Sequence, residues 1–314
     1  MKVSTSRNFG LLGTLGCTLV AYACSATPNS SSPSSSGVGG GNSEGVGGNS
    51  GYIVPGTGST STTGTAVNAK LTDGSLQILG KIRDFPLAFV DMEPCAHSAS
   101  KLCDTGNVEQ NPTPSDPKQN CGAGTKYPNS CFISTTLGAD SKPVYVGPST
   151  GTPSNFGPDT FAYWFNTDPE GLINKEQDTG FILHDNGNGT YSYISDAYFP
   201  IDGQLFGNEG QVDGAGNPHN YGFTTEFHMK FAYRTGATFY FKGDDDLLVF
   251  IDGKLVVDRS GIHNAQQATL NLDDLQLSPG QNYQFDLFYC ERHRTLSDLT
   301  ITTSMEFTET VPIN

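Results

Sequence analysis

The sequence predicts an all-β fold, an antiparallel β-sandwich or barrel, on three observations. Segments rich in β-branched and aromatic residues recur in the C-terminal half, at Phe239–Lys242, Leu247–Asp258, Tyr283–Tyr289 and Leu299–Phe307. Gly and Pro interrupt the chain throughout, and no stretch of helical period exceeds about two turns. Short strands at this spacing are typical of sandwiches and barrels.

Two local signals refine this prediction. Asp252-Gly253 lies between the apolar runs 247–251 and 254–257, and this dipeptide between two such runs predicts a β-hairpin turn. Phe161–Phe165 is the one segment for which we expect a short helix.

The N-terminus resembles an export signal. Lys2 and Arg7 are the only charges before residue 25, and Phe9–Ala23 is an apolar stretch too short to span a bilayer comfortably. The small residue Ala23 directly before Cys24 is what lipoprotein cleavage requires, so residues 1–24 predict a lipoprotein-type signal with lipidation at Cys24. Cys17 is a weaker candidate, and ordinary cleavage near Ala23 would release a soluble protein.

Residues 25–67 are almost entirely Ser, Gly, Thr, Pro, Asn and Val, a composition that predicts a disordered linker. A flexible coil of this length reaches about 35 Å. Residues 68–314 are then long enough for one large β domain. We expect an exported protein at the outer membrane or cell surface, or secreted, which contacts membrane only through its lipid anchor.

The formal net charge of −15 makes nucleic acid and anionic lipid poor partners. It is compatible with divalent cations and neutral sugars.

Four cysteines, Cys95, Cys103, Cys121 and Cys131, fall in a segment rich in Pro, Gly and Asn. In an oxidising compartment they predict a disulfide-bearing, loop-rich N-terminal insertion, with three possible pairings. Their spacing fits no compact zinc finger, although zinc is the alternative. Cys290 is either buried and free or the partner of one of the four.

The run Asp244-Asp245-Asp246 lies directly between two apolar strands. Three adjacent carboxylates repel one another unless a cation compensates, and carboxylate oxygens on an irregular loop are ligands that Ca²⁺ accepts. The alternative is a solvated turn.

A second polar cluster, Glu291–Arg294, follows the strand that ends near Cys290, and Ser297-Asp298 precedes the last strand. Acid, guanidinium and imidazole groups together could hold a polyol by hydrogen bonds, although an ion pair of Glu291 with Arg292 or Arg294 is the common alternative. His219, Asn220 and Glu226, and the segment 261–264, are supporting groups only.

Several spaced motifs, in one order, resemble the fibro-slime domain family. They are 82–85 (IRDF), 207–210 (GNEG), 219–226 (HNYGFTTE), 241–246 (FKGDDD), 250–258 (FIDGKLVVD), 261–263 (GIH) and 288–293 (FYCERH). The C-terminal part of that family is similar to the anthrax-protective-antigen-like sandwich, which includes the fungal flocculation adhesins. The resemblance covers about 80 to 310.

The resemblance implies a Ca²⁺ ion bound by two successive Asp residues joined by a cis peptide, which fall on Asp244 and Asp245. A further ligand, Asn in those adhesins, falls on Asp298 here, and Asn264 is an additional candidate. Asp246, Arg292, His293 and His263 are the predicted ligand-binding residues. Arg259 replaces a small turn residue of the family pattern.

The resemblance therefore implies a Ca²⁺-dependent carbohydrate-binding or adhesion protein that is not an enzyme. One alternative is a structural matrix or cell-contact protein in which Ca²⁺ only stabilises loops. Another is a polysaccharide hydrolase, and a retaining glycosidase requires two carboxylates about 5 Å apart. With 32 acidic residues such a pair can always be nominated, so the sequence gives this alternative little support.

Overall fold

The computed structural model describes residues 66–92, 132–147, 157–294, 296–311 and 313, all within the compact unit Gly47–Asn314. The predicted export signal, the predicted lipidation site Cys24, nearly all of the predicted linker and the four candidate disulfide cysteines lie outside these residues. Across the described part of the chain, no helix is long and apolar enough to cross a membrane. Cys290 is a buried free thiol.

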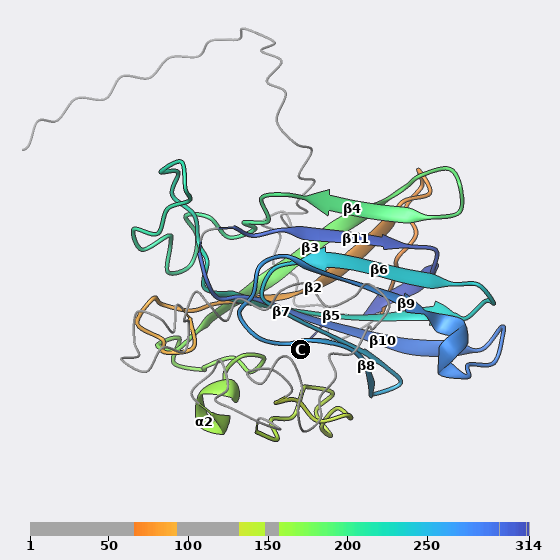
Figure 1. The fold of residues 1–314 in the computed structure, drawn as a ribbon, viewed down its shortest axis with the longest axis horizontal. Helices are drawn as coiled ribbons and strands as arrows, with labels where there is room; N and C mark the ends of the chain where they lie inside the picture. Colours follow the sequence, from red (N-terminus) through yellow and green to blue (C-terminus); the bar gives the residue numbers. More distant parts are fainter. Residues whose placement is uncertain (1–65, 93–131, 148–156, 295, 312, 314) are drawn as a thin grey trace, which may run out of the picture. The chain divides into compact units, whose positions relative to one another are not determined.

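Ten strands follow one continuous path of hydrogen-bonded antiparallel neighbours, and two more lie beside it (Figure 1). In the order of the path they are β8 (Lys254–Arg259), β7 (Asp246–Ile251), β10 (Asn282–Glu291), β5 (Phe223–Ala232), β2 (Leu76–Asp84), β3 (Lys175–Asp185), β4 (Tyr191–Ser195), β11 (Leu299–Thr303), β6 (Thr238–Gly243) and β9 (Gln266–Asn271). β12 (Phe307–Val311) pairs with β5 and with β1 (Val67–Asn68).

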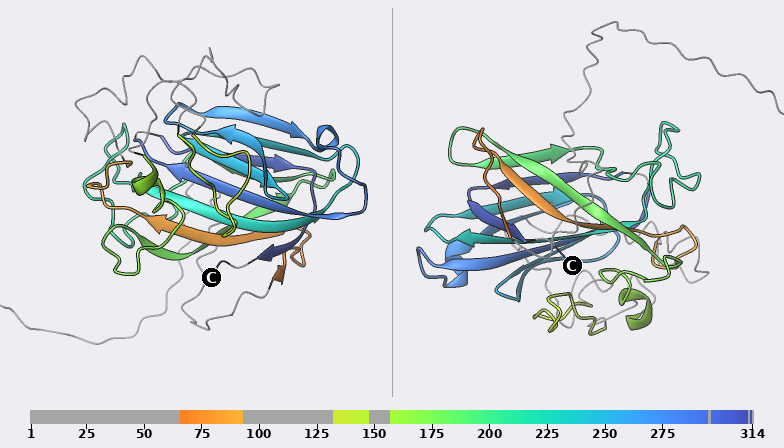
Figure 2. Two further views of the ribbon diagram at one scale, coloured as in Figure 1. Left: turned by 90° about the horizontal axis from the view of Figure 1, so that it is seen from below. Right: turned by 180° about the vertical axis from the view of Figure 1, so that it is seen from behind.

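The path folds into two layers because β3 is shared between them. Lys175–Leu183 of β3 pairs with β2, whereas His184 and Asp185 pair with β4. The first layer thus contains β8, β7, β10, β5 and β2, and the second contains β4, β11, β6 and β9 (Figure 2). The predicted antiparallel all-β sandwich is confirmed.

A large apolar core fills the space between the layers, and a second, smaller one lies on the outer face of the first layer. Along β7 the side chains alternate between them: Leu247, Val249 and Ile251 belong to the first core, and Leu248 and Phe250 to the second. Because both faces are buried, the strand reads as an unbroken apolar run.

The second core is completed by residues 85–92, 132–147 and 157–174, which we call the covering layer. Its aromatic side chains pack on apolar side chains of β7, β8 and β10. The members of this core are Phe132, Ile133, Phe161, Trp164, Phe165, Leu248, Phe250, Leu255, Phe288 and Cys290. Edge-on aromatic contacts join the two sides, such as Phe165 with Phe288 at a centroid distance of 4.9 Å.

The hairpin at Asp252-Gly253 is confirmed, with φ of 48° and 69° as a type I′ turn needs. The other two local expectations need correction. The one-turn helix α2 is Pro158–Phe161, begun by a proline at its first position, and the chain turns after it. Leu299–Phe307 is not one strand, because 304–306 separates β11 from β12. A 3-10 helix, η1 (Leu272–Leu275), follows β9.

Gly80 on β2 lies where the chain permits no side chain, which allows a direct test of the β2–β5 pairing. A Cβ there would lie 2.2 Å from the Glu226 carbonyl oxygen and 2.5 Å from Phe227 Cδ1. We expect Gly80→Ala to lower the free energy of unfolding by about 1–3 kcal/mol through overpacking. Chemical denaturation of Gly80→Ala and Gly214→Ala tests this, because a Cβ at Gly214 meets nothing within 4 Å; equal stability of the two variants would contradict the pairing.

Candidate functional site

The run Asp244–Asp246 lies at the point where the chain leaves β6 in one layer and enters β7 in the other. Gly243 allows this crossing, because a Cβ there would lie 2.5 Å from Phe241 Cζ and 2.8 Å from the Asp298 carbonyl oxygen. Asp245 takes a left-handed conformation, with φ of 55°. The described residues contain no cis peptide bond, so the cis linkage that the resemblance implies between Asp244 and Asp245 is not present.

Each of the three carboxylates accepts hydrogen bonds from the backbone of another loop. Asp244 Oδ1 accepts from the amide of Asp298 at 2.6 Å. Asp245 accepts from the amides of His263 at 3.1 Å and Arg292 at 2.8 Å. Asp246 Oδ1 accepts from the amide of Gly261 at 2.6 Å. The run therefore joins the β6–β7, β8–β9 and β10–β11 connections into one cluster.

Arg292 is the buried cation of this cluster. Its Nε donates to Asp246 Oδ2 at 2.6 Å, and the ion pair has side-chain exposures of 0% and 2%. Arg292 thus pairs with Asp246 and not with the neighbouring Glu291, whose Oε2 instead accepts from the Tyr289 hydroxyl at 3.2 Å. Glu291 is also fully buried.

Burial raises the pKa values of the acids in this cluster, and repulsion between neighbouring carboxylates adds to the effect. Burial and the neighbouring Asp298 carboxylate raise the pKa of Asp244 to about 6. Burial raises the pKa of Asp245 to about 7, against the opposing effect of Arg292. Burial, followed by repulsion from Asp244 and Asp245, holds the pKa of Glu291 well above its usual range. A bound cation would relieve all three.

The remaining predicted site residues occupy distinct places around the cluster. The amide of Asp298 joins this residue to the cluster by donating to Asp244. The Asp298 Oδ2 atom lies 3.4 Å from Nζ of the partly exposed Lys242. Asn264 is exposed, and its carbonyl oxygen lies 3.0 Å from Nδ1 of the buried His263. His293 is half-buried and donates its amide to Glu291 at 3.4 Å. Arg259 is fully buried, and its Nη1 donates to the Asp258 carbonyl at 3.2 Å.

The donors fit a hard cation in kind. Asp244, Asp245 and Asp298 all offer carboxylate oxygens, and these are the ligands that Ca²⁺ prefers. Yet in the part of the chain that the structure describes, no three His, Cys, Asp or Glu side chains converge as a metal-binding group. A bound ion would therefore need small rotations of these carboxylates.

Two contacts of this cluster come from the covering layer and are not apparent in the sequence. The Arg292 guanidinium lies over the ring of Trp164, with Cζ 4.5 Å from the ring centroid. Its Nη1 donates to the carbonyl oxygen of Asp91 at 3.2 Å, while the Asp91 carboxylate accepts from Trp164 Nε1 at 2.8 Å. The one signal that could have drawn attention to this place is that Trp164 is the single tryptophan of the chain.

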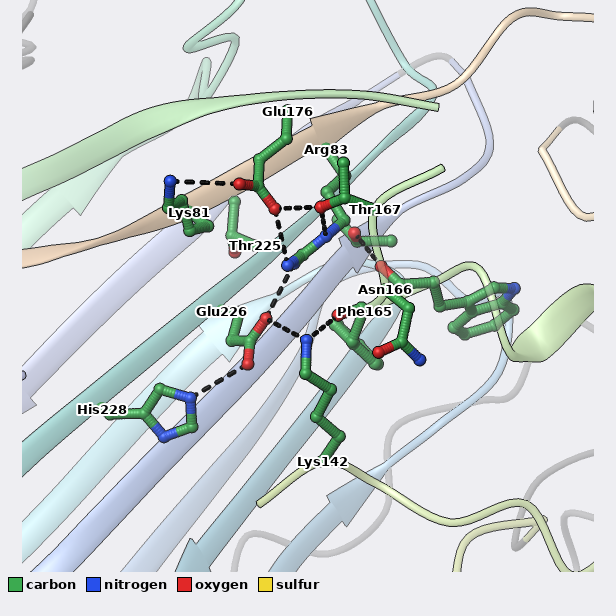
Figure 3. A network of polar contacts seen from close by, with 12 residues as sticks. Lys81, Arg83, Lys142, Phe165, Asn166, Thr167, Glu176, Thr225, Glu226 and His228 are labelled. Atoms are coloured by element: carbon green, nitrogen blue, oxygen red, sulfur yellow. Dashed lines mark hydrogen bonds and ion pairs between the residues drawn. The ribbon is translucent and has the colours of Figure 1, made fainter. Parts of the chain in front are cut away.

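A second polar network lies on the outer face of the first layer, and it holds Glu226, which the sequence suggested only as a supporting group (Figure 3). Arg83 Nη1 lies 2.7 Å from Glu226 Oε2, and Arg83 Nη2 lies 2.8 Å from Glu176 Oε2. Lys142 of the covering layer lies 3.5 Å from Glu226 and donates to the Phe165 carbonyl. The network therefore anchors the covering layer to β2, β3 and β5.

His228 closes this network on β5. Its Nδ1 lies 2.6 Å from Asp286 on β10, and its Nε2 lies 3.0 Å from Glu226. Burial alone would lower the pKa of His228, but hydrogen bonds to Asp286 and Glu226 outweigh it and raise the pKa to about 9. His219 belongs elsewhere: it stacks on Phe199 at 3.8 Å and pairs with Asp202 at 2.6 Å.

Comparison with known proteins finds a family model that matches part of this chain. The PA14 domain model matches residues 185–309. The match begins at the end of β3 and extends into β12, so it includes Asp244–Asp246, Arg292 and Asp298. β1, β2 and most of β3 precede it, yet β2 lies between β3 and β5 in the same sheet. The protective-antigen-like part of the resemblance is thus supported, while the wider fibro-slime assignment stays a prediction.

The curated relatives that match are longer proteins. Protein psiQ of Dictyostelium discoideum is 42% identical over 184 residues, 56% of this chain and 18% of its own. Protein psiD of the same organism is 40% identical over 184 residues, again 56% of this chain and 36% of its own. This chain therefore covers well under half the length of these relatives.

Solved structures with some likeness include the PA14 domain of the MpAFP antifreeze protein and a PA14 sugar-binding domain from an RTX adhesin. Each is 12% identical to this chain. The antifreeze domain covers 36% of this chain and 63% of its own, with a TM-score of 0.23. The adhesin domain covers 38% of this chain and 76% of its own, with a TM-score of 0.24. The assignment of the fold rests on the strand order above and not on these low scores.

The raised pKa of His228 makes stability depend on pH in alkaline solution. An unfolded histidine titrates near 6.5, so a folded pKa of about 9 contributes stability that is complete below pH 6.5 and is lost as pH rises through 9. We expect the melting temperature to fall between pH 7.5 and 9.5, by about 2–4 °C per kcal/mol lost.

His228→Gln is the matched control for that experiment, because the amide keeps polarity without titrating. Scanning calorimetry should show a shallower slope for the variant across the same window, above the pKa values of Asp244 and Asp245. Parallel curves for the two proteins would show that His228 is not the titrating group.

Proposed function

We propose that this protein is an exported, non-catalytic, Ca²⁺-dependent carbohydrate-binding protein that acts at a cell surface. The observation that carries the proposal is the buried carboxylate cluster at the β6–β7 crossing, whose excess negative charge a divalent cation would balance. The PA14 match supports it, since it covers the whole cluster, and one protein of limited likeness is titled a sugar-binding PA14 domain.

The ion would be held by Asp244 and Asp245, with Asp298 from the β10–β11 connection as a further ligand. The amide of Asp298 already donates to Asp244, and the amide of Arg292 in the same connection donates to Asp245. Asn264 on the adjoining loop is exposed and remains the predicted additional ligand. When bound, Ca²⁺ would supply open coordination positions that vicinal hydroxyls of a sugar can fill.

The direct contacts to sugar would come from the exposed rim of this cluster. His293 is half-buried beside it and keeps its predicted place as a donor. Arg292 and Asp246 are fully buried and paired with each other, so their part in the proposal is to hold the ligand carboxylates rather than to touch the sugar. His263 is likewise buried, and it supports the loop through the Asn264 and Arg259 carbonyl oxygens.

Lipidation at Cys24, with residues 25–67 as a spacer, would place the domain at the surface of the cell. This part of the proposal rests on the sequence alone. Mass spectrometry of the protein from a host with lipoprotein processing tests it: an acylated N-terminal Cys24 is expected, and an unmodified N-terminus beyond residue 24 would contradict it.

The Ca²⁺ site is tested by thermal unfolding of the full chain in EGTA and in excess Ca²⁺. A ligand that binds only the folded state at about 100 times its Kd stabilises by about 2.7 kcal/mol, so Ca²⁺ should raise the melting temperature of the wild type. In the Asp244→Asn/Asp245→Asn variant this rise should disappear.

Asp252→Asn is the matched control, because it removes one carboxylate from the turn that ends β7 and keeps a residue that tolerates φ of 48°. It should retain the full Ca²⁺ effect. A Ca²⁺ effect that persists in the double variant would show that the ion binds elsewhere.

Carbohydrate binding is tested by adding a mixed polysaccharide extract to the Ca²⁺-loaded protein. A further rise of the melting temperature that EGTA abolishes is the expected result. A Ca²⁺ effect without any response to polysaccharide would favour the structural role, in which Ca²⁺ only stabilises the loops.

A further inference from the structure

The covering layer contacts Arg292 of the carboxylate cluster through the ring of Trp164 and the carbonyl oxygen of Asp91. The Trp164 side chain is 1% exposed and belongs to the second apolar core, where it contacts Phe132, Phe161 and Phe165. Its other contacts are polar or charged: the guanidinium of Arg292 over its ring and the carboxylate of Asp91 at Nε1. Trp164 thus lies at the boundary between an apolar core and a charged site.

The contacts form an unbroken series from the covering layer to the carboxylates. Asp91 Oδ2 accepts from Trp164 Nε1 at 2.8 Å, and the Asp91 carbonyl oxygen accepts from Arg292 Nη1 at 3.2 Å. The guanidinium is planar and rigid, so fixing its Nη1 edge and one of its faces also fixes the direction of its Nε–H bond. That bond leads to Asp246 Oδ2 at 2.6 Å, and the Arg292 amide leads to Asp245 Oδ2 at 2.8 Å.

We propose that Trp164 and Asp91 are positioning residues of the carboxylate site, and that docking of the covering layer orients Arg292 and thereby places Asp245 and Asp246. Groups that orient a binding residue from outside its immediate contacts commonly change affinity when they are removed. Coupling of this kind is reciprocal, so the state of the carboxylates also acts on Trp164. The inference rests on the proposed function only in treating the carboxylates as ligands.

The reciprocal effect can be measured without any ligand, because Trp164 is the only tryptophan and its fluorescence reports on a single place. Asp246→Asn removes the charge that Arg292 pairs with, whereas Asp298→Asn removes one charge from the same site without a contact to Arg292. The coupling predicts that Asp246→Asn shifts the emission maximum and increases acrylamide quenching, and that Asp298→Asn leaves both unchanged. Unchanged emission in both variants, or equal shifts in both, would overturn the proposal.

The forward effect is measured by calorimetric titration with Ca²⁺ of Trp164→Phe and of Phe161→Leu. Both residues are buried in the second core. The guanidinium of Arg292 lies over the ring of Trp164 and not over the ring of Phe161. We expect Trp164→Phe to weaken Ca²⁺ binding by about tenfold, the lower end for such orienting groups. Phe161→Leu should lose thermal stability to a similar degree and bind Ca²⁺ as the wild type does.

The two experiments separate failure of this inference from failure of the proposed function. If the wild type binds no Ca²⁺ but Asp246→Asn still changes Trp164 emission, the proposed function is wrong and the coupling stands. If the wild type and Trp164→Phe bind Ca²⁺ equally, or if Phe161→Leu weakens binding as much as Trp164→Phe, the positioning role is overturned. Thermal unfolding of every variant verifies that it is folded.

Discussion

The guanidinium of Arg292 lies where four buried carboxylates, those of Asp244, Asp245, Asp246 and Glu291, meet at the β6–β7 and β10–β11 connections. Its ion pair with Asp246 is the one fully buried charge pair of this cluster, and its amide is also a donor to Asp245. Removing one partner from such a pair costs about 3–5 kcal/mol, because the other charge is left without compensation. The place of Asp245, which accepts from the Arg292 amide, therefore depends on how this pair holds Arg292.

The position of Arg292 depends in turn on how the first layer of the sandwich is covered. β7 and β10 bury both faces, so they need an apolar partner on the outside as well as the core on the inside. The covering layer supplies that partner and carries Trp164 and Asp91 with it. Lys142 of the same layer also pairs with Glu226 on β5, and Glu226 pairs in turn with Arg83 on β2. A packing requirement and a site requirement are thus met by the same segments.

The two charged networks differ in their balance, and this difference bears on function. Around Glu226 the acids alternate with Lys81, Arg83, Lys142 and a protonated His228, so each carboxylate has a cationic neighbour. Around Asp244 the acids outnumber the cations, and the pKa values rise. The first arrangement is that of a structural network. The second is the arrangement that the proposed cation would balance.

Local patterns in the sequence were sufficient for part of this structure. Alternation and turn chemistry located β6, β7, β8 and the Asp252-Gly253 hairpin, because these features depend on residues that are neighbours in the chain. The Asp244–Asp246 run was also noticed from its position between two strands, whereas it was the resemblance that grouped Asp298 with it. The structure brings these residues together through hydrogen bonds that agree with the predicted grouping.

The remaining features depend on contacts between distant segments. The place of β2 between β3 and β5 is set by pairing across more than 90 residues, and nothing local predicts it. Ser304-Met305-Glu306 divides the last predicted strand, because β11 and β12 join different layers. Trp164 and Asp91 were missed since only the folded chain brings them to Arg292. The partners of Glu226 lie on β2, β5 and the covering layer, so its local motif gave no sign of the network that it joins.

The central claim is that the carboxylate cluster at the β6–β7 crossing holds a cation. Crystals of the full chain grown with Ca²⁺, and measured for anomalous scattering, test it most directly. The account predicts a peak within coordination distance of the Asp244 and Asp245 side chains, at about 2.3–2.6 Å from their oxygens, with Arg292 still paired with Asp246. A cluster without a peak at saturating Ca²⁺, or a peak bound only by other residues, would contradict it.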